Sequence, residues 1–148
     1  MSVRLTDAPF DPGALLSDFA RNRTETGAVA TFTGLARAEA GATTVLELEA
    51  YPGFTEAQIG RIADQACERF GLHALAILHR VGRIAPGDPI VFVATAAGHR
   101  RAAFEACEFL MDYLKSRAPF WKKEHGPSGE RWIEPTAQDH ADRERWGG

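Results

Sequence analysis

All three lysines of this 148-residue chain lie within one stretch of nine residues, as Lys115, Lys122 and Lys123. Lysine and arginine together number 17, so the other 14 of these side chains are arginines. An arginine side chain keeps its proton in proteins, whereas a desolvated lysine can lose its proton near neutral pH and act as an acid, a base or a nucleophile. The clustering of the lysines therefore indicates chemistry rather than a general surface charge.

Each lysine also has a purely structural alternative. Lys115 falls in the last turn of a predicted helix, where a cation stabilises the helix by complementing its dipole. Lys122 and Lys123 follow Phe120 and Trp121, whose rings could desolvate an amine and lower its pKa or could instead anchor the segment in the core. The local sequence leaves both alternatives open.

A second group of candidates lies at the start of the same helix. His99, Arg100 and Arg101 follow a predicted strand, where free backbone N–H groups and the positive end of the helix dipole favour an anion such as phosphate. Alternatively, His99 caps the helix and the arginines are solvated. Arg37 follows another predicted strand in a loop of small residues, where it is either a binding side chain held by a rigid element or plain surface.

The two ends of the long helix are too far apart to share a small ligand within one chain. The 16 steps from His99 to Lys115 span ~24 Å along a straight helix at ~1.5 Å per residue. Either the chain has two sites, or a second copy completes one site. We hypothesise a twofold dimer that brings His99 and Arg100 of one subunit beside Lys115 of the other.

Hydrophobic spacing and turn signals predict the helices that position these side chains. Asp11 and Pro12 open a short first helix. A second helix begins with a capping box at residues 55–58 and stops at Gly71, and a third runs from His99 to about Ala118. The expected buried face of the third helix comprises Ala103, Phe104, Cys107, Leu110, Met111 and Leu114.

Strands are predicted at residues 27–34 and 45–51, and residues 74–81 and 89–96 are expected to form an antiparallel hairpin around a turn at 82–88. A short strand is expected at residues 131–134. The polar tail, 135–148, is expected to be ordered only against a partner. This order of elements predicts one domain with a core of about residues 3–134 and an α+β fold, in which helices pack on a mainly antiparallel sheet.

Composition excludes several classes of protein. The formal charge of −3, with 45% hydrophobic and 25% charged residues, is globular and provides no bulk attraction to nucleic acid or membrane. The N-terminus lacks the pattern of a signal peptide, so we expect a soluble, cytoplasmic protein with Cys67 and Cys107 as reduced thiols. No cysteine or histidine spacing is typical of zinc, and we expect neither a metal nor a cofactor.

The order and spacing of five motifs resemble the large catalytic subunit of molybdopterin synthase. The motifs are GAVATFTGLAR, LELEAYPGFTE, LHRVGRIAPGD, IVFVATAAGHRRAAFEACEFLMDYLKSRAPFWKKE and GERWIE. The resemblance implies an α/β hammerhead fold and a homodimer that binds a small ubiquitin-like subunit at each end, as a heterotetramer. The small subunit has a C-terminal Gly-Gly thiocarboxylate, which supplies sulfur to cyclic pyranopterin monophosphate and so forms the molybdopterin dithiolene.

The resemblance also implies roles for individual residues. It assigns Lys115 and Lys122 as catalytic, and Arg37, His99 and Arg100 as substrate-binding, with the histidine-arginine pair acting across the dimer interface. Lys123 is expected to point outward.

This chain departs from the family pattern before the strand arginine. It has Leu35 and Ala36 where relatives often have a lysine and a valine, so no charged role is expected at Leu35. The C-terminal Trp146-Gly147-Gly148 resembles the Gly-Gly tail of the small subunit only by coincidence, because no region of ubiquitin-like size precedes it.

Other classes of function are also compatible with the basic residues. They could dock an acidic tail in a non-catalytic interaction module, or Lys115 could form a Schiff base with a carbonyl substrate. Nucleic-acid binding is the least expected, because the net charge is negative and no recognisable motif is present.

Overall fold

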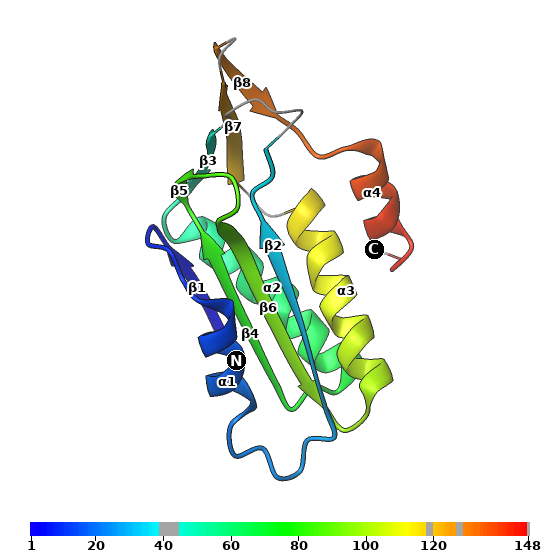
Figure 1. Ribbon diagram of the computed structural model, residues 1–148. Helices are drawn as coiled ribbons and strands as arrows, with labels where there is room; N and C mark the ends of the chain where they lie inside the picture. Colours follow the sequence, from blue (N-terminus) through cyan, green and yellow to red (C-terminus); the bar gives the residue numbers. More distant parts are fainter. Residues whose placement is uncertain (39–44, 118–119, 127–128, 148) are drawn as a thin grey trace.

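The computed structural model describes residues 1–38, 45–117, 120–126 and 129–147 (Figure 1). The helices are α1 Pro12–Ala20, α2 Phe54–Phe70, α3 Arg100–Ser116 and α4 Ala137–Glu144. The strands are β1 Ser2–Thr6, β2 Ala28–Leu35, β3 Val45–Ala50, β4 Ala74–Arg80, β5 Gly82–Ile84, β6 Pro89–Ala97, β7 Phe120–Gly126 and β8 Gly129–Ile133. None of the helices in the described part of the chain is long and apolar enough to cross a membrane.

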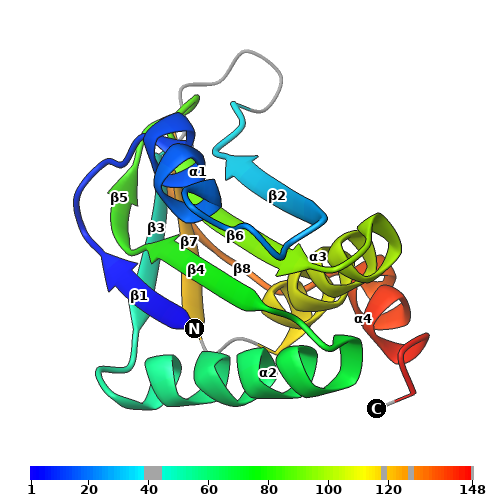
Figure 2. The same cartoon turned by 90° about the horizontal axis from the view of Figure 1, so that it is seen from below.

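A central sheet in the order β1-β4-β6-β2 carries helices on both faces. Its β4–β6 and β6–β2 pairs are antiparallel, whereas β1 runs parallel to β4. Figure 2 shows α1 over one face and α2 under the other, with α3 beside α2. The α+β fold with helices packed on a mainly antiparallel sheet is therefore confirmed.

Alternation along β4 and β6 builds the two layers of the core, because successive side chains of a strand point to opposite faces. Leu75 and Ile77 belong to the large cluster that includes α2 and α3, whereas Leu78 packs in a smaller cluster with residues of α1. Full burial of each such aliphatic side chain contributes about 1.5–3 kcal/mol. The larger cluster includes Ile59, Ile62, Ala66, Leu75, Ile77, Val93, Phe109 and Leu110.

A side sheet in the order β5-β3-β7-β8 projects from the central one. It explains two differences from the sequence-based expectation. Residues 82–84, expected within a turn, form β5 and pair with β3. The lysine-bearing segment forms β7 and pairs with both β3 and β8. The segment 74–80 still pairs with 89–97 as expected, but the connection between them leaves the central sheet.

The helix boundaries confirm most of the predicted signals. The Asp11 carboxylate accepts a hydrogen bond from the backbone N–H of Gly13, so the first helix is capped as expected. Gly71 ends α2 in the left-handed conformation, with φ of 61°. The predicted capping box at residues 55–58 is wrong, because α2 begins one residue earlier and the Thr55 hydroxyl accepts from the N–H of Tyr51 instead.

The predicted buried face of α3 is wrong at one position. Phe104 is 64% exposed, although Ala103, Cys107 and Leu110 are buried as expected. Successive residues of a helix are 100° apart, so Phe104 lies just beyond the edge of the stripe that faces the core. A large exposed aromatic side chain therefore stands near the start of α3. The expected helix end at Ala118 and Pro119 lies outside the described residues.

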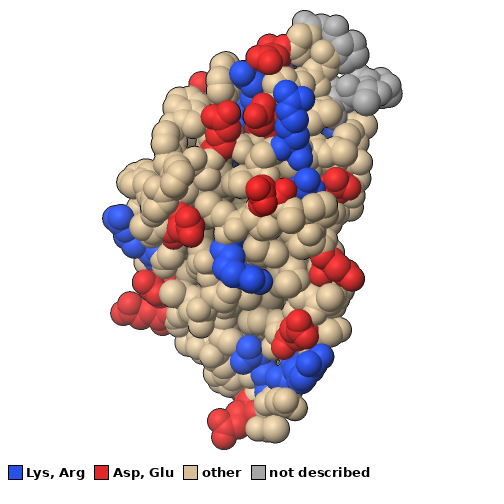
Figure 3. All heavy atoms as spheres, turned by 90° about the vertical axis from the view of Figure 1, so that its left-hand side faces the viewer, with Lys and Arg blue, Asp and Glu red and all other residues tan. Residues whose placement is uncertain are grey.

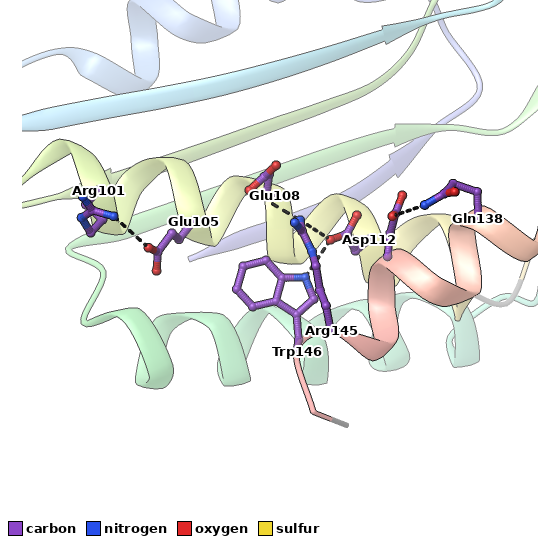
Figure 4. A network of polar contacts seen from close by, with 8 residues as sticks. Arg101, Glu105, Glu108, Asp112, Gln138, Arg145 and Trp146 are labelled. Carbon is purple, nitrogen blue, oxygen red and sulfur yellow. Dashed lines mark hydrogen bonds and ion pairs between the residues drawn. The ribbon is translucent and has the colours of Figure 1, made fainter.

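The C-terminal tail contains a helix that packs on its own chain, so the expectation of order only against a partner was wrong. A capping box formed by Thr136 and Asp139 opens α4. Beyond α4, Arg145 and Trp146 both donate hydrogen bonds to the Asp112 carboxylate on α3, at 2.9 and 2.7 Å (Figure 4). The Trp146 ring also lies edge-on to Phe109. These contacts fix the tail against α3.

Charged side chains of both signs are interspersed on the face shown in Figure 3, the left-hand side of Figure 1. Among the described residues visible there, basic side chains do not segregate into one region. On this face, therefore, the described basic side chains form no extended anion-binding surface.

Candidate active site

A cavity of about 360 Å³ lies where the central sheet, the end of α3 and the side sheet meet. Three of the predicted residues line it: Arg37, Lys115 and Lys122. We call it the lysine cavity. Its apolar lining includes Phe32, Leu46, Leu48, Met111 and Leu114. The segment that leads into α4 forms another part of its wall.

The register of β7 decides which of the adjacent lysines faces this cavity. Lys122 lies opposite Leu48 of β3, and Lys123 lies opposite Glu47. Directly opposed residues project from the same face of a sheet. Because Leu48 is only 1% exposed, Lys122 points to the buried face and Lys123 to the solvent face.

The Lys122 amine is electrostatically perturbed. Its pKa falls to about 8, first because the surrounding chain desolvates the charged form and second because the positive charge of Lys115 lies nearby. The Asp139 carboxylate opposes this shift. A lysine with this pKa exchanges protons readily near neutral pH, as a general acid or base must.

Lys115 reaches the same cavity from the last turn of α3. Only one side of this turn packs on the core. Leu114 lies on that side and is buried, whereas Lys115 lies on the other side and is exposed. Lys115 is thus the more exposed of the two amines, and Lys122 is the more buried, so we call their two ends of the cavity the open and the closed side. One lysine from a helix and one from a strand, seven positions apart in sequence, converge on a single space.

Arg37 follows Ala36, whose backbone N–H and carbonyl groups are both hydrogen-bonded to the turn at residues 87–88. The N–H of Ala36 donates to the carbonyl of Asp88 at 2.9 Å, and the N–H of Gly87 donates to the carbonyl of Ala36 at 2.7 Å. The Ala36 side chain is buried beside Leu48 and Ile84. These bonds hold the exposed Arg37 at the rim of the lysine cavity. Leu35 is 56% exposed, and it also lines this cavity.

His99 and Arg100 line a different cavity, of about 450 Å³, together with Arg101, Phe104 and Glu105. His99 is the N-cap residue of α3, but its side chain makes no capping hydrogen bond. His99 therefore occupies the capping position that the structural alternative gives it, although only through its backbone, and Arg100 and Arg101 are exposed as that alternative also expects. Within one chain the structure does not bring this pair to the lysine cavity, in agreement with the ~24 Å length of the helix between them.

The sequence-based predictions missed three ionisable residues that line the lysine cavity, namely His79, Glu134 and Asp139. His79 stands in an apolar strand, which concealed it. Asp139 belongs to the helix that was not predicted. The Thr136-Asp139 spacing of a capping box was the available signal for that helix.

A further cavity, of about 730 Å³, lies between α2 and α3 and is lined by none of the predicted site residues. Arg61, Arg69 and Arg117 line it. Arg69 donates a hydrogen bond to the Trp146 carbonyl and lies over aromatic rings. This groove therefore includes the packing site of the C-terminal tail, whereas the perturbed amine of Lys122 lies in the lysine cavity.

Replacing Lys123 by alanine is expected to change turnover by less than about twofold. Its Nζ pairs with the Glu130 carboxylate at 2.9 Å and lies 4.6 Å from the centre of the Trp132 ring, on the solvent face of the side sheet. Ion pairs at the surface contribute little stability, and here one partner, Glu130, is exposed while Lys123 is half-buried. Steady-state rates of the Lys123→Ala and Lys122→Ala enzymes provide the measurement, and a loss at Lys123 as large as that at Lys122 would reverse the assignment of the two faces.

Replacing Lys122 by methionine is expected to raise the melting temperature at pH 7. The folded chain lowers the Lys122 pKa to about 8, whereas the unfolded chain has the ordinary value of about 10.4. Below pH 8 the folded state bears the full cost of holding the charged amine, and this cost disappears as the pH rises from 8 towards 10.4 because the folded state releases its proton first.

Thermal unfolding at pH 7 and at pH 10 measures this difference. The gain from Lys122→Met should shrink at pH 10, while Lys123→Met, on the solvent face, provides a matched control without such a gain. An equal gain from Lys122→Met at both pH values would contradict a depressed pKa.

The chain matches the MoaE protein family over residues 5–117. It is 70% identical over 146 residues to the molybdopterin synthase catalytic subunit of Caulobacter vibrioides, covering 99% of this chain and 97% of that protein. A molybdopterin biosynthesis MoaE protein from Burkholderia ambifaria has a TM-score of 0.85 at 45% identity, covering 99% and 98% of the two chains. The crystal structure of molybdopterin synthase from Staphylococcus aureus has a TM-score of 0.78 at 32% identity, covering 87% and 94%.

Proposed function

Because this chain belongs to the MoaE protein family, we propose that it is the catalytic subunit of a molybdopterin synthase, acting in molybdenum cofactor biosynthesis. It is a sulfurtransferase whose partner is a small ubiquitin-like subunit with a C-terminal thiocarboxylate. Its substrate is cyclic pyranopterin monophosphate. The free thiols of Cys67 and Cys107 suit the reducing cytoplasm, where we place this activity.

The observation that carries the proposal is the convergence of Arg37, Lys115 and Lys122 on one cavity. The substrate and the thiocarboxylate are both anionic, so a site for them needs donors and positive charge. The apolar lining around the lysines lowers the local dielectric and strengthens these interactions. A perturbed amine in such a place is typical of a catalytic group rather than of a structural cation.

In the proposed reaction, two sulfur transfers take place, and in each the thiocarboxylate sulfur forms a C–S bond to a carbon of the pterin side chain while a C–O bond at that carbon breaks. The oxygen leaves on the phosphate in one transfer, as the cyclic phosphate opens, and as water in the other. Water then attacks the resulting thioester, whose acyl–sulfur bond breaks, so that sulfur stays on the pterin and the carrier leaves as a carboxylate. Lys115 stabilises the tetrahedral adduct of this hydrolysis and moves protons as the cyclic phosphate opens. Lys122, at the closed side, is the second acid-base group, and Arg37 binds phosphate at the rim.

His99 and Arg100 enter the site from a second copy of the chain. In one copy they line a separate cavity whose wall includes the exposed Phe104. An exposed aromatic ring beside an exposed histidine and arginine is typical of a surface that another protein covers. In the homodimer that we propose, this end of α3 lies against the lysine cavity of the partner, and one small subunit binds at each end to give a heterotetramer.

The decisive experiment mixes the purified chain with the thiocarboxylated small subunit and cyclic pyranopterin monophosphate. Mass spectrometry should detect the dithiolene product, and the same mixture with the carboxylate form of the small subunit serves as the control. Absence of product with competent reagents would refute the proposed function.

A Schiff-base mechanism is the second candidate, favoured by the pKa of about 8 at Lys122, because a fraction of this amine is uncharged near neutral pH. Borohydride reduction during turnover would trap such an adduct as a stable mass increase on the chain. We expect no adduct at either lysine.

A further inference from the structure

His79 forms part of the buried wall of the lysine cavity although it stands in a core strand. It is 6% exposed and lies near the end of β4. Strand alternation places it on the same face as Leu75 and Ile77, which are part of the large core cluster. Where this apolar stripe ends, the imidazole of His79 lines the cavity in place of another aliphatic side chain.

Two contacts fix the orientation of the ring. Its Nδ1 lies 2.9 Å from the backbone carbonyl oxygen of Arg80, and its face stacks on Phe120 with 4.2 Å between ring centres. A carbonyl oxygen only accepts hydrogen bonds, so Nδ1 carries the hydrogen atom. The tautomer follows from this contact, and the opposite ring nitrogen, Nε2, is left with its lone pair when the imidazole is neutral.

The imidazole is neutral at physiological pH. Its pKa falls to about 4, because burial disfavours the charged form and because Lys122 and Lys115 add positive charge nearby. The hydrogen bond to the Arg80 carbonyl opposes this shift. Within the described residues, no hydrogen bond to Nε2 is present. Among the described residues, the fully buried side-chain nitrogen atoms without a partner are Arg80 Nε and Arg143 Nε. Nε2 of His79 is not one of them, which agrees with an atom that is open to the cavity and can accept a hydrogen bond from a molecule there.

The other polar groups of the cavity explain why a neutral acceptor is useful. Arg37, Lys115 and Lys122 are donors when charged, and they suit the anionic parts of a ligand. Glu134 and Asp139 are acceptors, but their negative charge repels a phosphate or a thiocarboxylate. An N–H or O–H group on an otherwise anionic ligand therefore finds in Nε2 an acceptor that does not repel the rest of the molecule.

We propose that His79 is a substrate-binding residue whose Nε2 accepts a hydrogen bond from an N–H or O–H group on the ring system of the pterin. This inference rests on the proposed function, since it assumes a heterocyclic phosphate as substrate. It assigns the two parts of the substrate to different groups: cations bind the phosphate, and the neutral histidine selects the ring.

Three substitutions of His79 distinguish the effect of losing the Nε2 acceptor from the effect of losing the contact between its ring and Phe120. His79→Phe keeps an aromatic ring against Phe120 and removes both nitrogens. His79→Asn keeps an N–H near the position of Nδ1 but does not reach the position of Nε2, whereas His79→Gln places an amide oxygen near Nε2. Each variant is assembled with the small subunit in its carboxylate form, so that binding is measured without turnover.

Isothermal titration with cyclic pyranopterin monophosphate should show a Kd raised about tenfold by His79→Phe and His79→Asn, and by less than about threefold by His79→Gln. Competition by inorganic phosphate should be unchanged in all three variants, whereas Arg37→Ala should weaken both ligands. If His79→Phe fails to fold, as judged by circular dichroism, the comparison of His79→Asn with His79→Gln decides.

If His79→Phe or His79→Asn binds the pterin as tightly as the unmodified chain does, the inference is overturned. A parallel loss of phosphate and pterin affinity would also overturn it, since that result indicates a general distortion of the cavity. Failure of the unmodified assembly to bind the pterin at all would instead refute the proposed function, so the two failures are distinguishable.

Discussion

Enzymes with Lys115→Ala or Lys115→Arg are both expected to lose at least about a hundredfold in turnover, the scale of a removed general acid or base. Alanine removes the amine. Arginine keeps the positive charge but does not release a proton near neutral pH, and its planar head is larger than an ammonium group. If Lys115 moves protons, the two variants must therefore fail alike.

The fold should survive both substitutions. Lys115 is exposed at the end of α3, and arginine complements the helix dipole as well as lysine does. Circular dichroism and thermal unfolding check this point, and Lys123→Arg provides the matched control, because it makes the same chemical change on the solvent face. A fully active Lys115→Arg enzyme would show that only the charge matters at this position.

The two lysines are also coupled, which makes the Lys115 variants informative at Lys122. The positive charge of Lys115 is one of the causes that lower the Lys122 pKa. Lys115→Ala should raise the pKa of Lys122, whereas Lys115→Arg should leave it depressed. The pH dependence of residual activity can therefore separate the loss of Lys115 itself from a change at Lys122.

The parts of the fold that were predictable from sequence are those in which one physical signal dominates. The apolar face of α2 and the left-handed Gly71 at its end depend only on neighbouring residues in the sequence. The same is true of the Asp11 cap of α1. The predicted alternation of buried and exposed side chains in residues 45–50 is also confirmed, because Leu48 is buried whereas Glu49 is exposed.

The missed parts depend on long-range pairing. The segment 120–126 reads as a mixture of aromatic and charged residues, and it becomes a strand only because β3 and β8 flank it. Residues 82–84 look like part of a turn, and they form β5 because β3 lies alongside. The order of strands that creates the lysine cavity was therefore not readable from any single stretch.

The candidate site divides in the same way. The concentration of lysines around the predicted helix end indicated chemistry, and the family resemblance then selected Lys115 and Lys122 from the three. Their convergence required the register of β7. His79 gave no signal, since a single histidine in an apolar strand is usually a core residue with satisfied hydrogen bonds. Its role emerges only when the tautomer and the cavity wall are considered together.

Two inactive variants are expected to restore activity when they are combined in one dimer. In the proposed homodimer, each active site takes Lys115 from one copy and Arg100 from the other. A dimer of one Lys115→Ala copy and one Arg100→Ala copy then has one site with both changes and one site with neither. Random exchange gives about half mixed dimers, each with one intact site of two, so the mixture should reach about a quarter of the unmodified activity.

The experiment mixes the two variants at equal concentration under conditions of subunit exchange and measures dithiolene formation with saturating small subunit. Lys115→Ala mixed with Lys122→Ala is the matched control. Both lysines line the cavity of one chain, so the mixed dimers of this control have one altered lysine in each site and should stay inactive.

Recovery in the control as well would indicate that the lysines act in different copies. No recovery in the test pair, despite mixed dimers detected by native mass spectrometry, would contradict a shared site. The ~24 Å between His99 and Lys115 along α3 is the reason for this test: if both residues act on one small substrate, two helices must contribute opposite ends, whereas two separate sites in one chain predict no recovery.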